Sequence, residues 1–155
     1  MTQNELQKAF AILDSCIVPC NKLHKVSENK VSFLLDRSQV KDEFWCIKVD
    51  NCMIKSNEHE KCDFAFIRQK KDTHKSKEFY FVELKNALID KAYSQIATTI
   101  KQHFKSPPKQ ECFGFIVANR VPSGTDVQNL RKKFRRDIGA DLIVKSSTYT
   151  HTPSV

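Results

Sequence analysis

Two short apolar segments carry charged side chains in positions that suit chemistry. Asp63 begins residues 63–67, and Glu83 and Lys85 lie at the end of a second apolar segment. Because successive side chains of a strand point to opposite faces, Glu83 and Lys85 share a face. An antiparallel hairpin with its turn near Thr73 places Asp63 opposite Glu83. The spacing therefore predicts a pair of carboxylates and a lysine at one end of one hairpin.

A pair of carboxylates supplies oxygen ligands that suit a hard cation, Mg²⁺ or Mn²⁺. A metal bound by Asp63 and Glu83 would activate water and neutralise the charge that develops on a phosphate. Lys85 would hold or deprotonate the attacking water, or stabilise the pentavalent phosphate directly. The residue types therefore indicate metal-dependent phosphodiester hydrolysis, with Asp63 and Glu83 as metal ligands and Lys85 as a catalytic residue.

The composition limits the architecture and the class of ligand. With 155 residues, 40% of them hydrophobic, the chain has enough apolar material for one ordinary core. We expect a single domain over residues 1–145 and a flexible polar tail over residues 146–155. The formal net charge of +8 favours a polyanionic partner such as nucleic acid. The glycines Gly114, Gly124 and Gly139 lie far apart, which excludes glycine-rich phosphate loops of the Walker and dinucleotide types.

The cysteines and the apolar runs bear on the cellular compartment. No apolar run approaches the ~18 residues that span a membrane, and the start of the chain has no apolar secretion segment. The sequence therefore predicts a cytoplasmic protein without membrane association, with reduced thiols. Cys16, Cys20 and His24 are spaced by four, and with Cys52 or Cys62 they form an alternative set of zinc ligands. Because no CxxC pair occurs, we expect buried free thiols instead.

Hydrophobic periodicity predicts helices and strands in an order typical of an α/β domain. The predicted helices cover residues 4–14, 87–104 and 123–136, and the predicted strands cover residues 31–35, 44–49, 63–67, 79–84, 113–118 and 141–144. Asp50 and Asn51 supply a tight turn after the second of these strands. The order predicts a mixed sheet with helices on both faces.

The pattern around Asp63 resembles the PD-(D/E)XK nuclease superfamily, which has the restriction-endonuclease-like fold. The motif of that superfamily is an Asp near the start of one strand and Glu-x-Lys at the end of the next, as in Asp63 and Glu83-Leu84-Lys85. The αβββαβ order of the family core matches residues 4–118, and a C-terminal helix and a short strand follow. The resemblance thus implies an α/β fold with a restriction-endonuclease-like core, a mixed sheet flanked by helices.

The resemblance also implies roles for single residues. Asp63 and Glu83 would bind Mg²⁺ or Mn²⁺, and Lys85 would be catalytic. Many members place a Gln on the helix after the motif, and Gln95 stands there as a second catalytic residue. The backbone carbonyl of Leu84 would be a further metal ligand.

The chain departs from the family pattern in two places. Cys62 stands where many members have Pro before the Asp. Many members also carry an additional acidic residue on the first helix, and Glu5, Asp14 and Glu28 are all candidates here.

A dense basic run lies on the last predicted helix. One interpretation is a patch that contacts phosphates, and the other is a solvated helix face. The candidate nucleic-acid-binding residues are Arg131, Lys132, Lys133, Arg135 and Arg136. A second group of lysines, between residues 70 and 77, lies at the far end of the hairpin from the site, so we do not expect it to bind substrate.

The leading hypothesis is a metal-dependent endonuclease that acts on DNA, in genome defence or repair by analogy with the superfamily. It would be a homodimer or a subunit of a larger complex. One alternative is a structure-specific resolvase of the Holliday-junction type. Others are an inactive nucleic-acid-binding or assembly protein on the same fold, a protein partner of a nuclease, and an ordinary salt-bridged strand edge at Asp63, Glu83 and Lys85.

Overall fold

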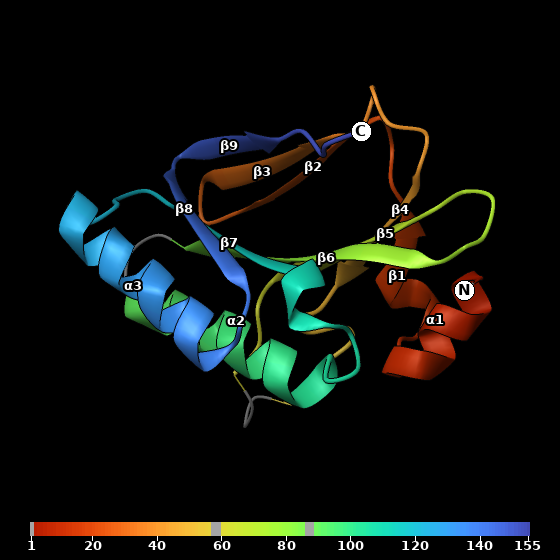
Figure 1. The fold of residues 1–155 in the computed structure, drawn as a ribbon, viewed down its shortest axis with the longest axis horizontal. Coiled ribbons are helices and arrows are strands. Elements are labelled where there is room, and N and C mark those ends of the chain that lie inside the picture. Colours follow the sequence, from red (N-terminus) through yellow and green to blue (C-terminus); the bar gives the residue numbers. More distant parts are fainter. Residues whose placement is uncertain (1, 57–59, 86–88) are drawn as a thin grey trace.

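A six-stranded mixed sheet forms the centre of the molecule (Figure 1). The structure is a computed structural model that describes residues 2–56, 60–85 and 89–155. Neighbouring strands are antiparallel from β1 to β6, whereas β6, β7 and β8 run parallel, so the predicted mixed sheet is confirmed. The strands lie in the order β1 (Ile17–Pro19), β4 (Glu43–Lys48), β5 (Phe64–Gln69), β6 (Ser76–Lys85), β7 (Cys112–Ala118) and β8 (Asp141–Ser146).

The described helices all cover one face of this sheet (Figure 1). They are α1 (Gln3–Phe10), α2 (Ile89–His103) and α3 (Gly124–Asp137), and their side chains Leu6, Ile96 and Phe134 are buried in one common core. The connections β6–α2–β7 and β7–α3–β8 advance in the same direction across the sheet. Right-handed crossovers of this kind place both helices on the same face. The prediction of helices on both faces is therefore wrong.

A three-stranded sheet covers the opposite face (Figure 1). It consists of β2 (Leu23–Glu28), β3 (Val31–Asp36) and β9 (Thr148–His151), with β3 in the middle. Phe33 of β3 packs against Phe66 and Phe115 of the large sheet, with ring centroids 5.5 and 5.1 Å apart. The sequence did not predict β2, because Val26 is the one residue of that strand with a buried side chain.

The C-terminal residues are part of this fold, contrary to the predicted flexible tail over residues 146–155. Strand β9 pairs in parallel with β3. The rings of Tyr149 and His151 pack against Phe115, with centroids 6.0 and 4.9 Å apart. The buried guanidinium of Arg68 donates a hydrogen bond to the Ser154 carbonyl. The prediction failed because only every second residue of β9 is half-buried, which makes so short a strand look polar.

The helix boundaries follow local capping. Helix α1 ends at Phe10 rather than at the predicted residue 14, because Ala11 adopts a left-handed conformation with φ of 55°. The predicted helix over residues 123–136 is confirmed, and the Ser123 hydroxyl accepts a hydrogen bond from the Asp126 amide. The predicted start of α2 at residue 87 lies outside the described residues. No helix within the described ranges is both long and apolar enough to cross a membrane. Short 3₁₀ helices, η1 (Asp14–Cys16) and η2 (Lys109–Glu111), precede β1 and β7.

A disulfide joins Cys16 to Cys52, contrary to the expectation that the thiols are reduced. The two Cα atoms are 5.6 Å apart, although 36 positions separate the residues in the sequence. Cys16 ends η1, and Cys52 lies in the turn that follows β4. The bond therefore ties the N-terminal segment to the connection that leads into β5.

Candidate functional site

Asp63 and Glu83 meet at one end of the β5–β6 hairpin, in the register that the sequence predicts. Phe64 pairs with Val82, so the preceding residue of β5 lies opposite Glu83. The backbone amide of Asp63 donates a hydrogen bond to Oε1 of Glu83 at 3.0 Å. The Asp63 carboxylate in turn accepts a hydrogen bond from the Leu84 amide at 2.9 Å. Backbone groups thus hold both carboxylates in place.

Both carboxylates are buried, and this changes their protonation. The residues are 7% and 1% exposed for Asp63 and Glu83. Burial raises the pKa of Glu83 to about 9, and the negative charge of Asp63 adds to the rise while Lys85 opposes it. Burial also raises the pKa of Asp63 to about 6, against the hydrogen bond from Leu84. The metal-free pair therefore keeps a proton near neutral pH, which a divalent cation between the carboxylates would displace.

Lys85 completes the predicted trio. Its Nζ atom is 3.5 Å from Oε2 of Glu83, and its side chain is one fifth exposed (20%). Both residues are on β6 and point to the face that carries the helices, as their spacing by two requires. Lys85 therefore extends from the buried carboxylates toward solvent, where a phosphate group would approach.

Helix α2 covers the carboxylate pair through residues one turn apart. The Thr99 hydroxyl accepts a hydrogen bond from the Cys62 amide at 2.9 Å and donates one to the Gln95 carbonyl at 2.7 Å. This fixes α2 against the residue that precedes Asp63. The Oε1 atom of Gln95 is buried and has no hydrogen-bond partner among the described residues. Gln95 thus lies on the predicted helix near the site, with a polar atom available for a bound water or ligand.

Two further acidic residues act on Asp63. The negative charges of Glu28, at the end of β2, and of Asp50, after β4, both contribute to the raised pKa of Asp63. The Asp50 carboxylate is 3.8 Å from Nζ of Lys61, and its backbone amide donates a hydrogen bond to the Asp63 carbonyl at 3.3 Å. The sequence analysis assigned Asp50 to a turn alone. Its position directly after the strand that pairs with β5 was the signal that it lies near the site.

The other candidates from the N-terminal segment lie elsewhere. Glu5 is exposed on α1 and hydrogen-bonds to Thr2, and Asp14 accepts a hydrogen bond from Gln7 at 2.6 Å. Of the three acidic candidates, Glu28 is thus the one whose charge reaches Asp63.

The Leu84 carbonyl, expected as a further metal ligand, already has a partner. It accepts a hydrogen bond from Nδ2 of Asn29 at 3.1 Å, and Asn29 lies in the turn between β2 and β3. This contact joins the small sheet to the end of β6. Within residues 2–56, 60–85 and 89–155, no group of three or more His, Cys, Asp or Glu side chains is arranged to hold a metal ion. Asp63 and Glu83 remain a pair of carboxylate ligands, and Mg²⁺ commonly completes such a set with waters and substrate oxygens.

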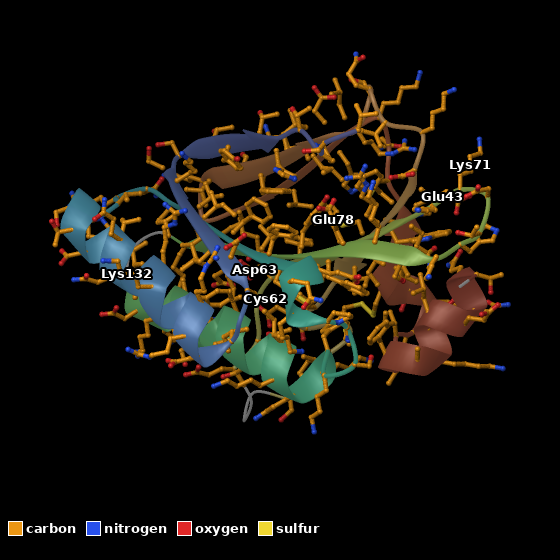
Figure 2. The ribbon with its side chains drawn as sticks, in the orientation of Figure 1. Glu43, Cys62, Asp63, Lys71, Glu78 and Lys132 are labelled. Atoms are coloured by element: carbon orange, nitrogen blue, oxygen red, sulfur yellow. A yellow bond between two sulfur atoms is a disulfide. The ribbon has the colours of Figure 1, made fainter. Side chains whose placement is uncertain are left out.

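The predicted basic residues of α3 are exposed but differ in their partners. Arg135 pairs with Asp141, and Arg136 with Asp137. Nζ of Lys133 lies 5.0 Å from the centroid of the Tyr93 ring. Figure 2 shows Lys132 on α3 and Lys71 at the β5–β6 turn on opposite sides of Asp63. The lysines of that turn thus lie at the far end of the hairpin, as expected.

The alternative zinc set is not assembled. Cys16 is bonded to Cys52 and belongs to the core on the helix side, whereas the thiol of Cys20 lies near that of Cys46 beneath the small sheet. His24 accepts a hydrogen bond from the Asn21 amide at 3.2 Å.

Comparison of the chain with models of protein families, with curated proteins and with solved structures finds no match. The argument for function therefore rests on the chemistry and geometry of the side chains around Asp63 and Glu83.

Proposed function

We propose that the protein is a metal-dependent nuclease that hydrolyses phosphodiester bonds in DNA. The proposal rests on one observation, which is the buried contact between Asp63 and Glu83 beside Lys85. Placing carboxylates side by side away from water costs free energy unless a proton or a cation compensates. An ordinary salt bridge at a strand edge does not require this arrangement. The αβββαβ order and the net charge of +8 agree with the proposal.

The carboxylates would hold Mg²⁺ or Mn²⁺, whose chemistry is to activate water and to neutralise the charge on the reacting phosphate. Lys85, held as an ammonium by its contact with Glu83, would donate a hydrogen bond to a phosphate oxygen. The water oxygen bonds to phosphorus as one ester P–O bond breaks, and the leaving oxygen takes up a proton. Gln95 would position the water from α2.

Cleavage of supercoiled plasmid DNA tests the proposal. The assay compares Mg²⁺, Mn²⁺ and EDTA for the wild type and for Lys85→Ala. Lys25→Ala is the matched control, because Lys25 is an exposed strand lysine on the small sheet. We expect nicking that requires metal, survives in the control and disappears in Lys85→Ala. If the wild type neither cleaves nor binds metal, the trio is a structural salt bridge and the proposal is wrong.

The oligomeric state bears on which DNA is cut. A homodimer would present a site to each strand of a duplex, or to opposed strands of a four-way junction. We propose comparing linear duplex with a four-way junction in the same assay, together with the molar mass of the protein in solution. Preferential cleavage of the junction by a dimer would favour a resolvase.

A second candidate function is nucleic-acid binding without hydrolysis. It is favoured by the exposed Arg131 and Lys132 on α3, which lie apart from the carboxylate pair. This candidate predicts salt-sensitive DNA binding that Asp63→Asn and Lys85→Ala leave unchanged, with no cleavage in any metal.

A further inference from the structure

A cavity of about 660 Å³ lies at the carboxyl ends of β6 and β7. Its wall is formed by the start of α2, by the loop that follows β7, and by one side of α3. Ligands of α/β proteins commonly bind outside the carboxyl ends of parallel strands, where helices diverge from the sheet. The volume falls within the range of ~300–1,000 Å³ that is typical of pockets for small molecules. The residues used below are Arg120, Val121, Pro122, Asn129, Leu130 and Lys133.

The cavity is next to the candidate catalytic lysine. Lys85 pairs with Ala118 at the ends of β6 and β7, and the Asn119 amide donates a hydrogen bond to the Lys85 carbonyl at 3.2 Å. Arg120 is the next residue along this loop and lines the cavity. A strand of nucleic acid with one phosphate at Lys85 would therefore bring a neighbouring nucleotide to the cavity.

The lining combines the groups that a nucleotide requires. Val121, Pro122 and Leu130 supply apolar surface on which a base can stack. Asn129 supplies amide donors and an acceptor for the edge of a base. Arg120 and Lys133 supply positive charge for a phosphate.

The acidic residues of the cavity have a separate explanation. Asp90 and Asp126 lie in the first turns of α2 and α3, where a carboxylate compensates the positive end of the helix dipole. No ion pair or hydrogen bond within the described ranges engages the guanidinium of Arg120, which remains available for a ligand.

We infer that this cavity binds one unpaired nucleotide of the substrate strand, next to the phosphodiester bond that is cut. The inference rests on the proposed function for the position of the neighbouring phosphate. A base within a duplex is stacked and paired, so it reaches such a cavity only after leaving the helix. The protein should therefore bind single-stranded DNA, or the unpaired part of a duplex, better than intact duplex DNA.

Fluorescence anisotropy in EDTA tests the inference without hydrolysis. The probes are a labelled single-stranded oligonucleotide and a blunt duplex of the same length. Arg120→Ala removes the phosphate contact, and Val121→Trp fills the cavity. Lys25→Ala and Leu23→Trp are the matched controls, because both residues are exposed on β2, on the opposite layer of the molecule.

We expect each cavity variant to weaken single-strand binding about tenfold and duplex binding less than twofold, with both controls near the wild type. The inference is overturned if the cavity variants bind the single strand like the wild type. It is also overturned if they weaken both probes equally, since that result would reflect net charge alone. Plasmid cleavage by a protein whose cavity variants bind normally would retain the proposed function and reject this inference. The reverse result, cavity-dependent binding without cleavage in any metal, would retain the cavity and reject the nuclease.

Discussion

The backbone amide of Asp63 donates a hydrogen bond to the carboxylate of Glu83 at 3.0 Å, across two antiparallel strands. This contact holds Glu83 where the negative charge of Asp63 disfavours its ionised form. The buried pair is thus costly for the folded protein alone and well suited to a divalent cation. The predictions below follow from this relationship and from the charges and bonds around it.

Asp63→Asn and Glu83→Gln should each abolish tight Mn²⁺ binding, measured by isothermal titration calorimetry. A bound metal contributes several kcal/mol to transition-state stabilisation, so cleavage should fall at least about a hundredfold. Asp72→Asn, at an exposed carboxylate of the β5–β6 turn, is the matched control and should bind metal like the wild type. Wild-type metal affinity in either site variant would remove both residues from the ligand set.

The stability of the metal-free protein should fall as the pH rises from 7 toward 9. The pKa of Glu83 is about 9 in the folded protein and lower in the unfolded chain, so the folded state binds more protons in this range. Stability therefore decreases with increasing pH. Urea unfolding of the wild type and Glu83→Gln in EDTA measures the effect. The variant should lose part of this slope, whereas equal slopes would show that Glu83 ionises normally.

The same protonation makes metal binding depend on pH. Because a cation must displace the proton of the pair, Mn²⁺ affinity should increase from pH 6 to pH 8. Calorimetry in buffers of different ionisation enthalpy should detect proton release on binding. Binding without proton release would contradict the raised pKa values of Asp63 and Glu83.

Arg131→Ala and Lys132→Ala should weaken DNA binding to a similar extent for different sequences. Each change should lower the slope of log affinity against log salt concentration by about 1, because one phosphate contact is lost. Lys71→Ala removes the same charge from the opposite side of the molecule and should have little effect (Figure 2). Anisotropy titrations between low and moderate salt measure the slopes, and an equal effect of Lys71→Ala would exclude a specific role for α3.

Reduction of the Cys16–Cys52 disulfide should destabilise the protein. A closed loop with a sequence separation of 36 residues predicts a loss of about 2–4 kcal/mol from the constraint on the unfolded chain. Thermal unfolding with and without dithiothreitol measures it, and the double variant Cys16→Ser, Cys52→Ser should match the reduced wild type. Insensitivity of the wild type to reductant would show that the thiols are free in solution.

The sequence alone determined the parts of the molecule that depend on local periodicity. The alternation of β6 puts Glu83 and Lys85 on one face, and the length of the intervening segment puts Asp63 opposite Glu83. The strand order β4, β5, β6, α2, β7 also follows from local apolar patterns. These features were predictable because neighbours in the chain decide them.

Only the tertiary structure decided what surrounds this hairpin. Glu28 and Asp50 reach Asp63 from β2 and from the turn after β4, and Arg120 borders the cavity from the loop after β7. The disulfide, the second sheet and the ordered C-terminal strand likewise join segments that are far apart in the sequence. Such contacts depend on how layers pack, and the residues involved are too polar or too short a segment to reveal their partners by pattern alone.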